Sequence, residues 1–251
     1  MLVMGILNVT PDSFADGGKH NDFESAVARG LQMIAEGVDI IDIGGESTRP
    51  GADRVSEEEE IARTIPVITE LAKHAVKISI DTMRGSTATA AINAGASIIN
   101  DVSGGLADPL MLQTAAKLKV PYIAMHWRGQ SKDMNSKAIY GDVVKDVISE
   151  LQERIDAALD AGISKNNLII DPGLGFAKDT DHNWAIIDAI DQFVAMGYPV
   201  LVGGSRKRFL GGDSPDQREQ ATIELTKRLS KTGVWAVRVH SVKPHKEVLS
   251  A

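Results

Sequence analysis

Short apolar runs recur eight times along this 251-residue chain, and most of them end on a polar or charged residue. Each run is rich in β-branched residues and has the length of a strand buried on both faces of a parallel sheet. In chain order the runs are VMGILNVT, IIDIGGEST, KISIDT, SIINDV, YIAMH, LIIDPG, VLVGGSRK and AVRVH. Polar groups at the same end of many parallel strands predict one shared site.

Stretches with helical spacing of apolar residues separate these runs. FESAVARGLQMIAEG places Phe23, Val27 and Leu31 on one helical face, and Ser56 with the glutamates behind it predicts another helix start. Pro66 is expected to kink that second helix or reset its start. Several predicted helices end on a glycine suited to a left-handed cap, namely Gly37, Gly95, Gly162, Gly197 and Gly233.

Strict alternation of strands and helices predicts a (β/α)8 TIM barrel that forms a single domain over residues 1–251. The tail PHKEVLSA supplies a short eighth helix. An open, doubly wound sheet is the rival fold, and periodicity alone does not separate the two. The barrel is favoured because it places the first and last strands, which both end on polar residues, side by side.

Composition excludes several classes of function. The net charge is −7 and aromatic residues make up only 4% of the chain, which disfavours nucleic acid as a partner. The chain has no cysteine, which suits a reducing compartment and excludes thiolate chemistry. No signal peptide or membrane-spanning apolar run is recognisable, so a cytoplasmic protein with no membrane partner is expected.

Hydrogen-bond acceptors end the third, fourth and sixth runs, at Asp81, Asn100 and Asp171. In a barrel they would converge on a common ligand, and a flat nitrogen heterocycle with N–H and amino groups would satisfy them. Without that ligand each acid is expected to be unpaired. The alternatives are strand-end caps, ion pairs with a nearby lysine, or a divalent metal held with the help of substrate phosphates.

Basic and hydroxyl side chains end the last two runs, at Ser205 to Lys207 and at Arg238 and His240. Barrels commonly bind phosphate at the loops after these two strands. Arg238 and His240 are two residues apart, so they face the same side of a strand. His126 is interpreted as a supporting residue with its own partners, not as a base. An anion site beside the heterocycle pocket suggests a reaction in which a diphosphate leaves, helped by electrostatic stabilisation.

Two loops complete the pattern. LNVTPDSFADGG follows the first run and is long enough to act as a lid or substrate clamp, although a plain solvated turn is the alternative. GGESTRPGA follows the second run and combines glycines, hydroxyls and Arg49 in a way that suits an oxyanion.

These segments closely resemble the dihydropteroate synthases of folate biosynthesis. MGILNVTPDSFADGG, GGESTRPGA, ISIDT, IIND, MHWRG, DPGLGFAK, GGSRKRFLG and VRVH fall in the family's order and spacing, from residue 1 to about 243. The resemblance implies a transferase that condenses 6-hydroxymethyl-7,8-dihydropterin diphosphate with 4-aminobenzoate, gives 7,8-dihydropteroate and releases diphosphate, with Mg2+ as cofactor. It also implies either a sulfonamide target or a sulfonamide-insensitive form.

The same resemblance implies the roles of individual residues. The pterin ring is expected to contact Asp81, Asn100, Asp171, Lys207, Met125 and Phe176. The diphosphate is expected to contact Asn8, Arg49, Arg238 and His240, with Asn8 as the Mg2+ ligand. The 4-aminobenzoate side of the site is expected to comprise Thr48, Arg49, Pro50 and Ser205. The residues assigned to catalysis are Lys207, Arg238 and His240.

Two features depart from the family pattern. Ser241 stands where the family usually has Asp, and the seventh helix, ATIELTKRLSKTG, is more polar than expected. That helix normally contributes to a subunit interface, so the resemblance implies a homodimer. A non-catalytic pterin-binding paralogue is the main alternative function. Methyltetrahydrofolate-dependent methyltransferases also bind pterins in barrels, but the intact NVTPDSF and SRK segments speak against them.

Overall fold

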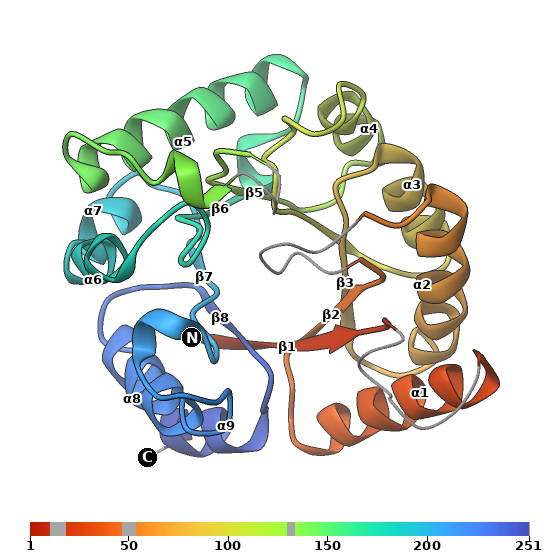
Figure 1. Ribbon diagram of the computed structural model, residues 1–251. Helices are drawn as coiled ribbons and strands as arrows, with labels where there is room; N and C mark the ends of the chain where they lie inside the picture. The colour runs from red at the N-terminus through yellow and green to blue at the C-terminus, as the bar shows by residue number, and fades with distance from the viewer. Residues whose placement is uncertain (11–18, 47–53, 130–133, 251) are drawn as a thin grey trace.

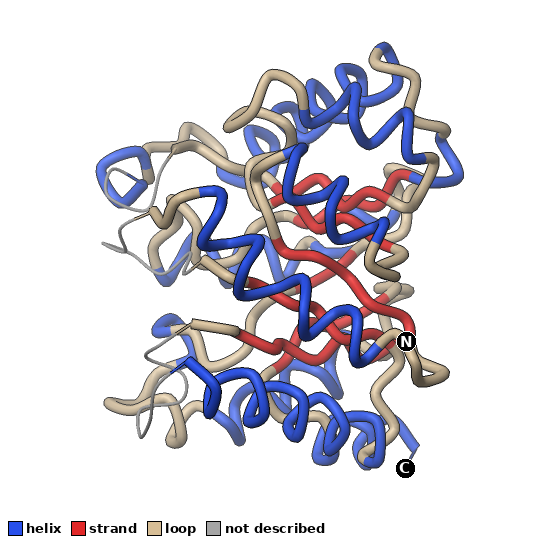
Figure 2. Tube along the Cα trace, turned by 90° about the vertical axis from the view of Figure 1, so that its right-hand side faces the viewer, coloured by secondary structure: helices blue, strands red, loops and turns tan. Residues whose placement is uncertain are grey.

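Eight parallel strands form a barrel with helices around it, as Figure 1 shows. The computed structural model describes residues 1–10, 19–46, 54–129 and 134–250. The strands are β1 (Leu2–Asn8), β2 (Ile40–Gly44), β3 (Lys77–Asp81), β4 (Ile98–Asp101), β5 (Tyr122–Met125), β6 (Leu168–Asp171), β7 (Leu201–Val202) and β8 (Ala236–Val239). Figure 2 shows from the side that the strands run through the middle of the molecule between the helices.

The barrel closes at two places that the open-sheet alternative would leave apart. β1 pairs in parallel with β8, from Leu2 opposite Ala236 to Gly5 opposite Val239. β6 and β7 are joined by one bridge between Ile170 and Val200. The (β/α)8 prediction is therefore confirmed, and the doubly wound alternative is wrong.

The helices lie where the apolar spacing predicts them. They are α1 (Lys19–Ala35), α2 (Glu57–Leu71), α3 (Gly85–Asn93), α4 (Met111–Leu118), α5 (Val143–Asp160), α6 (Thr180–Asp188), α7 (Ile190–Val194), α8 (Glu219–Leu229) and α9 (Lys243–Ser250). Ser56 caps α2 by accepting from the backbone N of Glu59 at 3.2 Å. Pro66 lies inside that helix, which continues to Leu71. The stretch NWAIIDAIDQFVAMG, whose apolar spacing predicts a single sixth helix, is divided into α6 and α7 at Ala189.

The glycines expected to end helices have the backbone conformation that this role requires. All five have φ between 80° and 116°, a region that residues with a Cβ rarely adopt. They are Gly37, Gly95, Gly162, Gly197 and Gly233. Among the described residues, no helix is long and apolar enough to cross a membrane.

An apolar cluster fills the barrel near the start of its strands. Seven strands each contribute one buried or nearly buried member: Met4, Ile40, Ile98, Ile123, Ile169, Leu201 and Ala236. Side chains two residues apart in a strand point to the same face. The residues that follow these members by two positions therefore also face the interior, and they include Asp42, Asn100, Asp171 and Arg238. The barrel interior thus has a layer of polar side chains packed against a layer of apolar side chains.

Alternation also decides which of two neighbouring polar residues faces this layer. Asn100 faces the interior, whereas Asp101 points to the outer side of β4. There, Asp101 accepts from the hydroxyl of Tyr122 at 2.7 Å and from the backbone N of Ser103 and Gly105. Asp101 therefore anchors the loop after β4.

Candidate active site

Arg238 joins two carboxylates at the centre of the polar layer. Its Nε donates to Oδ2 of Asp42 at 2.6 Å, and its Nη2 donates to Oδ2 of Asp81 at 2.6 Å. The side-chain amide of Asn100 donates to the same Asp42 oxygen at 3.0 Å. Four strands, β2, β3, β4 and β8, therefore supply one connected group of side chains. Charged groups buried in this way are stable only when they are paired.

Asp42 is the member of this group that the sequence analysis missed. It is fully buried, and its Oδ1 has no hydrogen-bond partner in the part of the chain that is described. A charged residue inside the run IIDIG was the available signal, because an aspartate in a strand buried on both faces must meet a partner. The sequence alone does not reveal that the partner of Asp42 is Arg238 on β8, which is separated from β2 by β1.

The pairing changes how these groups hold protons. Burial raises the pKa of Asp81 to about 7, against the pull of Arg238, and the neighbouring Asp42 raises it further. Burial opposes the charge of Arg238, yet the carboxylates of Asp42 and Asp81 raise its pKa above the ordinary value. The expectation that each acid is unpaired without a ligand is wrong for Asp81, because Arg238 already neutralises much of its charge.

Asp171 and Lys207 lie on the opposite side of the mouth. Oδ1 of Asp171 accepts from the backbone N of Gly173 at 2.7 Å, so this acid is also partnered. Burial raises its pKa, although the Gly173 amide and Lys207 oppose the shift. Burial lowers the pKa of Lys207 to about 8, with Asp171 acting against the change.

The loop after β6 holds Lys207 in place. Nζ of Lys207 donates to the carbonyl of Leu174 and lies 4.5 Å from the centre of the Phe176 ring. Phe176 itself packs against a small apolar cluster of Met83, Val102 and Met125. Met125 and Phe176 therefore lie on the same apolar side of the mouth, next to Lys207.

A buried lysine that the sequence analysis did not single out supports that loop. Nζ of Lys178 donates to the carbonyls of Gly173 and Phe176 at 3.1 and 3.0 Å, and lies 2.8 Å from Nδ1 of His126. Nε2 of His126 lies 2.9 Å from Glu150. Burial lowers the pKa of His126 to about 4, so the ring is neutral and accepts from Lys178. The interpretation of His126 as a supporting residue agrees with these contacts.

Ser205 and His240 contact each other on the β7–β8 side of the mouth. Oγ of Ser205 lies 2.9 Å from Nδ1 of His240 and accepts from its backbone N at 3.2 Å. The carbonyl of His240 accepts from Arg29 at 3.0 Å. Ser205 lies three positions beyond the end of β7, so the seventh strand is shorter than the run VLVGGSRK suggests.

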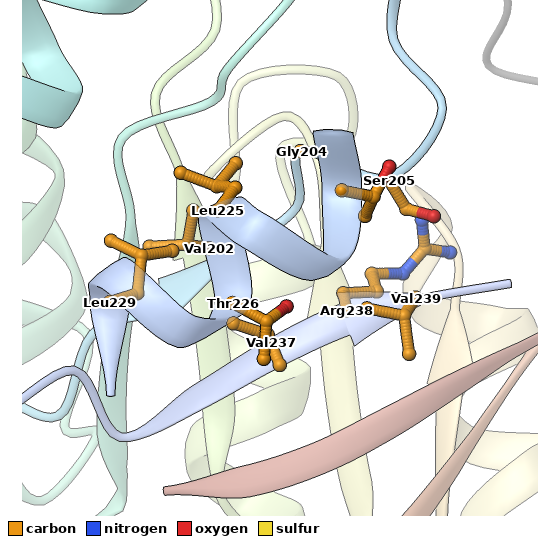
Figure 3. A pocket seen from close by; sticks show the side chains of 10 residues that line it. Val202, Gly204, Ser205, Leu225, Thr226, Leu229, Val237, Arg238 and Val239 are labelled. Atoms are coloured by element: carbon orange, nitrogen blue, oxygen red, sulfur yellow. The ribbon is translucent and has the colours of Figure 1, made fainter. Parts of the chain in front are cut away.

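Ser205 and Arg238 also line a small pocket behind the mouth, between β7, β8 and α8 (Figure 3). Its other end is apolar, where Val202, Leu225 and Leu229 meet. This pocket differs from the acid cluster in chemistry, because half of its lining residues are aliphatic and none is acidic.

The remaining site candidates belong to the loops after β1 and β2. Asn8 is half-buried at the last position of β1, beside Gly44 at the end of β2. Thr48, Arg49 and Pro50 lie outside the described residues, as does most of the loop after β1. Among the described residues, no group of three or more His, Asp or Glu side chains is placed to hold a metal ion.

Known proteins are similar to this chain in both sequence and fold. Residues 4–240 match the family described as pterin binding enzyme. The dihydropteroate synthase of Mycobacterium leprae is 47% identical over an alignment covering 98% of this chain and 90% of that protein.

Solved structures give the same result. The Xanthomonas albilineans dihydropteroate synthase with 4-aminobenzoic acid superposes with a TM-score of 0.94 at 44% identity, covering 99% of this chain and 90% of that one. A complex from that organism with 7,8-dihydropteroate gives 0.90 at 41% identity, covering 99% and 91%. Because these matches extend over nearly the whole sequence, the chain belongs to the pterin-binding enzymes and, among them, to the dihydropteroate synthases.

Proposed function

We propose that the protein condenses 6-hydroxymethyl-7,8-dihydropterin diphosphate with 4-aminobenzoate, forming 7,8-dihydropteroate and releasing diphosphate. The observation that carries this proposal is the interior placement of Asp81, Asn100 and Asp171 in one polar layer, with Lys207 beside them. The Xanthomonas enzymes with 4-aminobenzoic acid and with 7,8-dihydropteroate support it, because this barrel superposes closely on theirs.

The pterin ring is proposed to bind over the polar layer. Its N–H and amino groups are donors. The carboxylates of Asp81 and Asp171 are acceptors at the carboxyl ends of their strands, where the site lies. Asn100 can donate or accept, and Lys207 donates to a ring carbonyl or nitrogen. Met125 and Phe176 would cover one apolar face of the ring. A site of buried polar groups rejects ligands that leave those groups unpaired.

The diphosphate is proposed to lie towards Arg238 and His240, with Asn8 and Arg49 from the first two loops. The amine nitrogen of 4-aminobenzoate attacks the exocyclic methylene carbon of the pterin, and the bond from that carbon to the diphosphate oxygen breaks. The electron pair leaves with the diphosphate, and the new secondary amine loses one proton. Cationic and N–H groups aimed at the departing oxygens stabilise their growing charge. Lys207, Arg238 and His240 are proposed as the catalytic residues because they supply these groups.

Asn8 has the chemistry of a ligand for a magnesium ion that is bound mainly by substrate. Mg2+ keeps several waters and commonly takes only one or two protein oxygens in addition to substrate phosphates. The single amide oxygen of Asn8, with no three-residue acidic cluster among the described parts of the chain, fits that pattern. When bound, the ion supplies positive charge to the diphosphate.

The 4-aminobenzoate is proposed to bind at the rim of the mouth. Ser205 would donate to its carboxylate, while Thr48, Arg49 and Pro50 would line its other side. Sulfonamides mimic this substrate, so the same rim is proposed as their binding site. Inhibition of the purified protein by a sulfonamide, relieved by added 4-aminobenzoate, tests this part of the proposal.

A homodimer and a cytoplasmic location are proposed as well. The cysteine-free chain suits a reducing compartment. The dimer rests on the family resemblance, and light scattering of the purified protein would measure it directly.

The decisive experiment is to measure diphosphate release with the dihydropterin diphosphate and Mg2+, with and without 4-aminobenzoate. Release that requires the amine and yields dihydropteroate is expected. A protein that binds the pterin but releases no diphosphate would be the non-catalytic paralogue instead. Arg238→Ala in the same assay should raise KM for the diphosphate substrate.

A further inference from the structure

Arg206 holds an unfavourable backbone conformation between two proposed substrate ligands, Ser205 and Lys207. Its φ is 57°, in the left-handed region that residues with a Cβ rarely adopt. Such a residue persists only when its surroundings hold it there. The orientation of Ser205 relative to Lys207 depends on the backbone torsions of Arg206, because both residues are bonded to it.

Three hydrogen bonds hold Arg206, and two of them come from α8; a longer ion pair joins its Nη1 to the exposed Asp216 at 3.9 Å. Its backbone N donates to Oγ1 of Thr222 at 3.1 Å, and its Nε donates to Oε2 of Glu219 at 2.6 Å. Its Nη2 donates to Oγ of Ser241, just after β8, at 2.8 Å. Glu219 supplies the nearer and more buried charged partner, since its side chain is only 19% exposed whereas that of Asp216 is 92% exposed.

His245 on α9 is the neighbour of Glu219 on the side away from Arg206. Oε1 of Glu219 lies 3.6 Å from Nε2 of His245, which is beyond hydrogen-bond distance, and Nδ1 of His245 lies 2.7 Å from the hydroxyl of Thr226. Figure 3 shows α8 lying against β8 and the segment that carries Ser205. The carboxylate therefore faces Arg206 with one oxygen and His245 with the other.

We infer that Glu219 is a positioning residue that sets the orientation of Ser205 and Lys207 through Arg206. The inference deepens the proposed function and rests on it. Glu219 touches neither substrate, so its loss acts by lowering the fraction of molecules in which the loop is competent to bind. An apparent dissociation constant rises by the inverse of that fraction. Because one loop carries both ligands, the constants for both substrates should rise by the same factor.

The test compares Glu219→Gln with Glu224→Gln, which removes an exposed carboxylate from the same helix. KM for each substrate, kcat and the midpoint of thermal unfolding are measured for all variants. Glu219→Gln is expected to raise both KM values about tenfold, with kcat nearly unchanged, since a neutral amide oxygen accepts a weaker hydrogen bond from Arg206 than a carboxylate does. Glu224→Gln should leave both constants at the wild-type values.

A rescue variant separates positioning from general destabilisation. Ser241 already contacts the guanidinium, so Ser241→Asp in the Glu219→Gln background puts a carboxylate back beside Arg206. This double variant should restore both KM values to within about twofold of wild type. If Glu219→Gln does not fold, Thr222→Val removes one anchor of the Arg206 backbone and should raise both constants equally, by a smaller factor.

Unchanged KM values, a rise for one substrate alone, or no rescue by Ser241→Asp would overturn the inference. Failure of the proposed function is recognised separately, because the wild-type protein would then show no amine-dependent turnover. Calorimetric titration with the dihydropterin diphosphate measures the same shift in binding without turnover.

Discussion

Nη2 of Arg238 donates to Oδ2 of Asp81 at 2.6 Å, joining β8 to β3 across the interior of the barrel. The same guanidinium bonds Asp42 on β2. One cation is therefore shared by two buried carboxylates. Arg238, which the family resemblance implies to contact the substrate diphosphate, also joins side chains of β2 and β3.

Arg238→Ala is expected to destabilise the fold by about 3–5 kcal/mol at pH 8, because it leaves buried carboxylates uncompensated. The loss should be smaller at pH 6. The pKa of Asp81 is already raised to about 7, and removing the opposing arginine raises it further. A carboxyl group whose pKa is higher in the folded than in the unfolded protein contributes less stability as the pH rises towards the folded pKa. At pH 6 Asp81 is protonated, so the variant then buries less uncompensated charge. Urea unfolding at both pH values measures this, and an equal loss at pH 6 and 8 would contradict it.

Asp81→Asn is expected to weaken binding of the dihydropterin diphosphate by about 100-fold or more, since an amide presents a donor where the site needs an acceptor. Isothermal titration calorimetry measures the change. His74→Ala, at an exposed position after α2, is the control and should bind like wild type. Near-normal binding by Asp81→Asn would show that the pterin does not bind to the side chain at the end of β3.

The positions of Asp81, Asn100 and Asp171 could be predicted from the sequence because two simple rules fix them. Asp81 and Asp171 end buried parallel strands and Asn100 is the last residue but one of another, and parallel strands in one barrel end on the same side. Alternation then separates Asn100, which faces the interior, from Asp101, which anchors a loop.

Other parts of the site depend on contacts that no local pattern records. Asp42 pairs with a residue 196 positions away. Lys178 lies in the loop after β6, and its ammonium reaches back to the carbonyls of Gly173 and Phe176 where Gly173, Gly175 and Ala177 all have positive φ. A single alanine with φ of 47° is not a sequence signal, so this buried lysine was missed.

Ser205→Ala is expected to raise KM for 4-aminobenzoate about tenfold while leaving KM for the dihydropterin diphosphate near wild type, because only one hydroxyl contact is lost. The change also removes the contact with Nδ1 of His240. Steady-state kinetics with each substrate varied in turn measures both constants. Ser250→Ala, near the end of α9, is the matched control. An equal rise in both constants would mean that Ser205 acts on the loop and not on one substrate.

Lys178→Met is expected to flatten the dependence of stability on pH above neutrality. Burial lowers the pKa of Lys178 to about 7, with Asp171 opposing the shift and Lys207 and Arg128 adding to it. The ordinary value for lysine is 10.5, so between pH 7 and about 10 the unfolded chain binds more protons at this residue than the native protein does. Stability contributed by this residue therefore rises with pH across that window.

The difference in unfolding free energy between wild type and Lys178→Met should grow by up to about 1.4 kcal/mol per pH unit over that window. Urea unfolding at half-unit steps from pH 7 to 10 measures it. Lys145→Met is the control, because the Lys145 side chain is 82% exposed and its ammonium pairs with the exposed Asp142 at 2.8 Å. Parallel curves for wild type and Lys178→Met would show that the buried ammonium keeps its proton throughout, held by the carbonyls of Gly173 and Phe176.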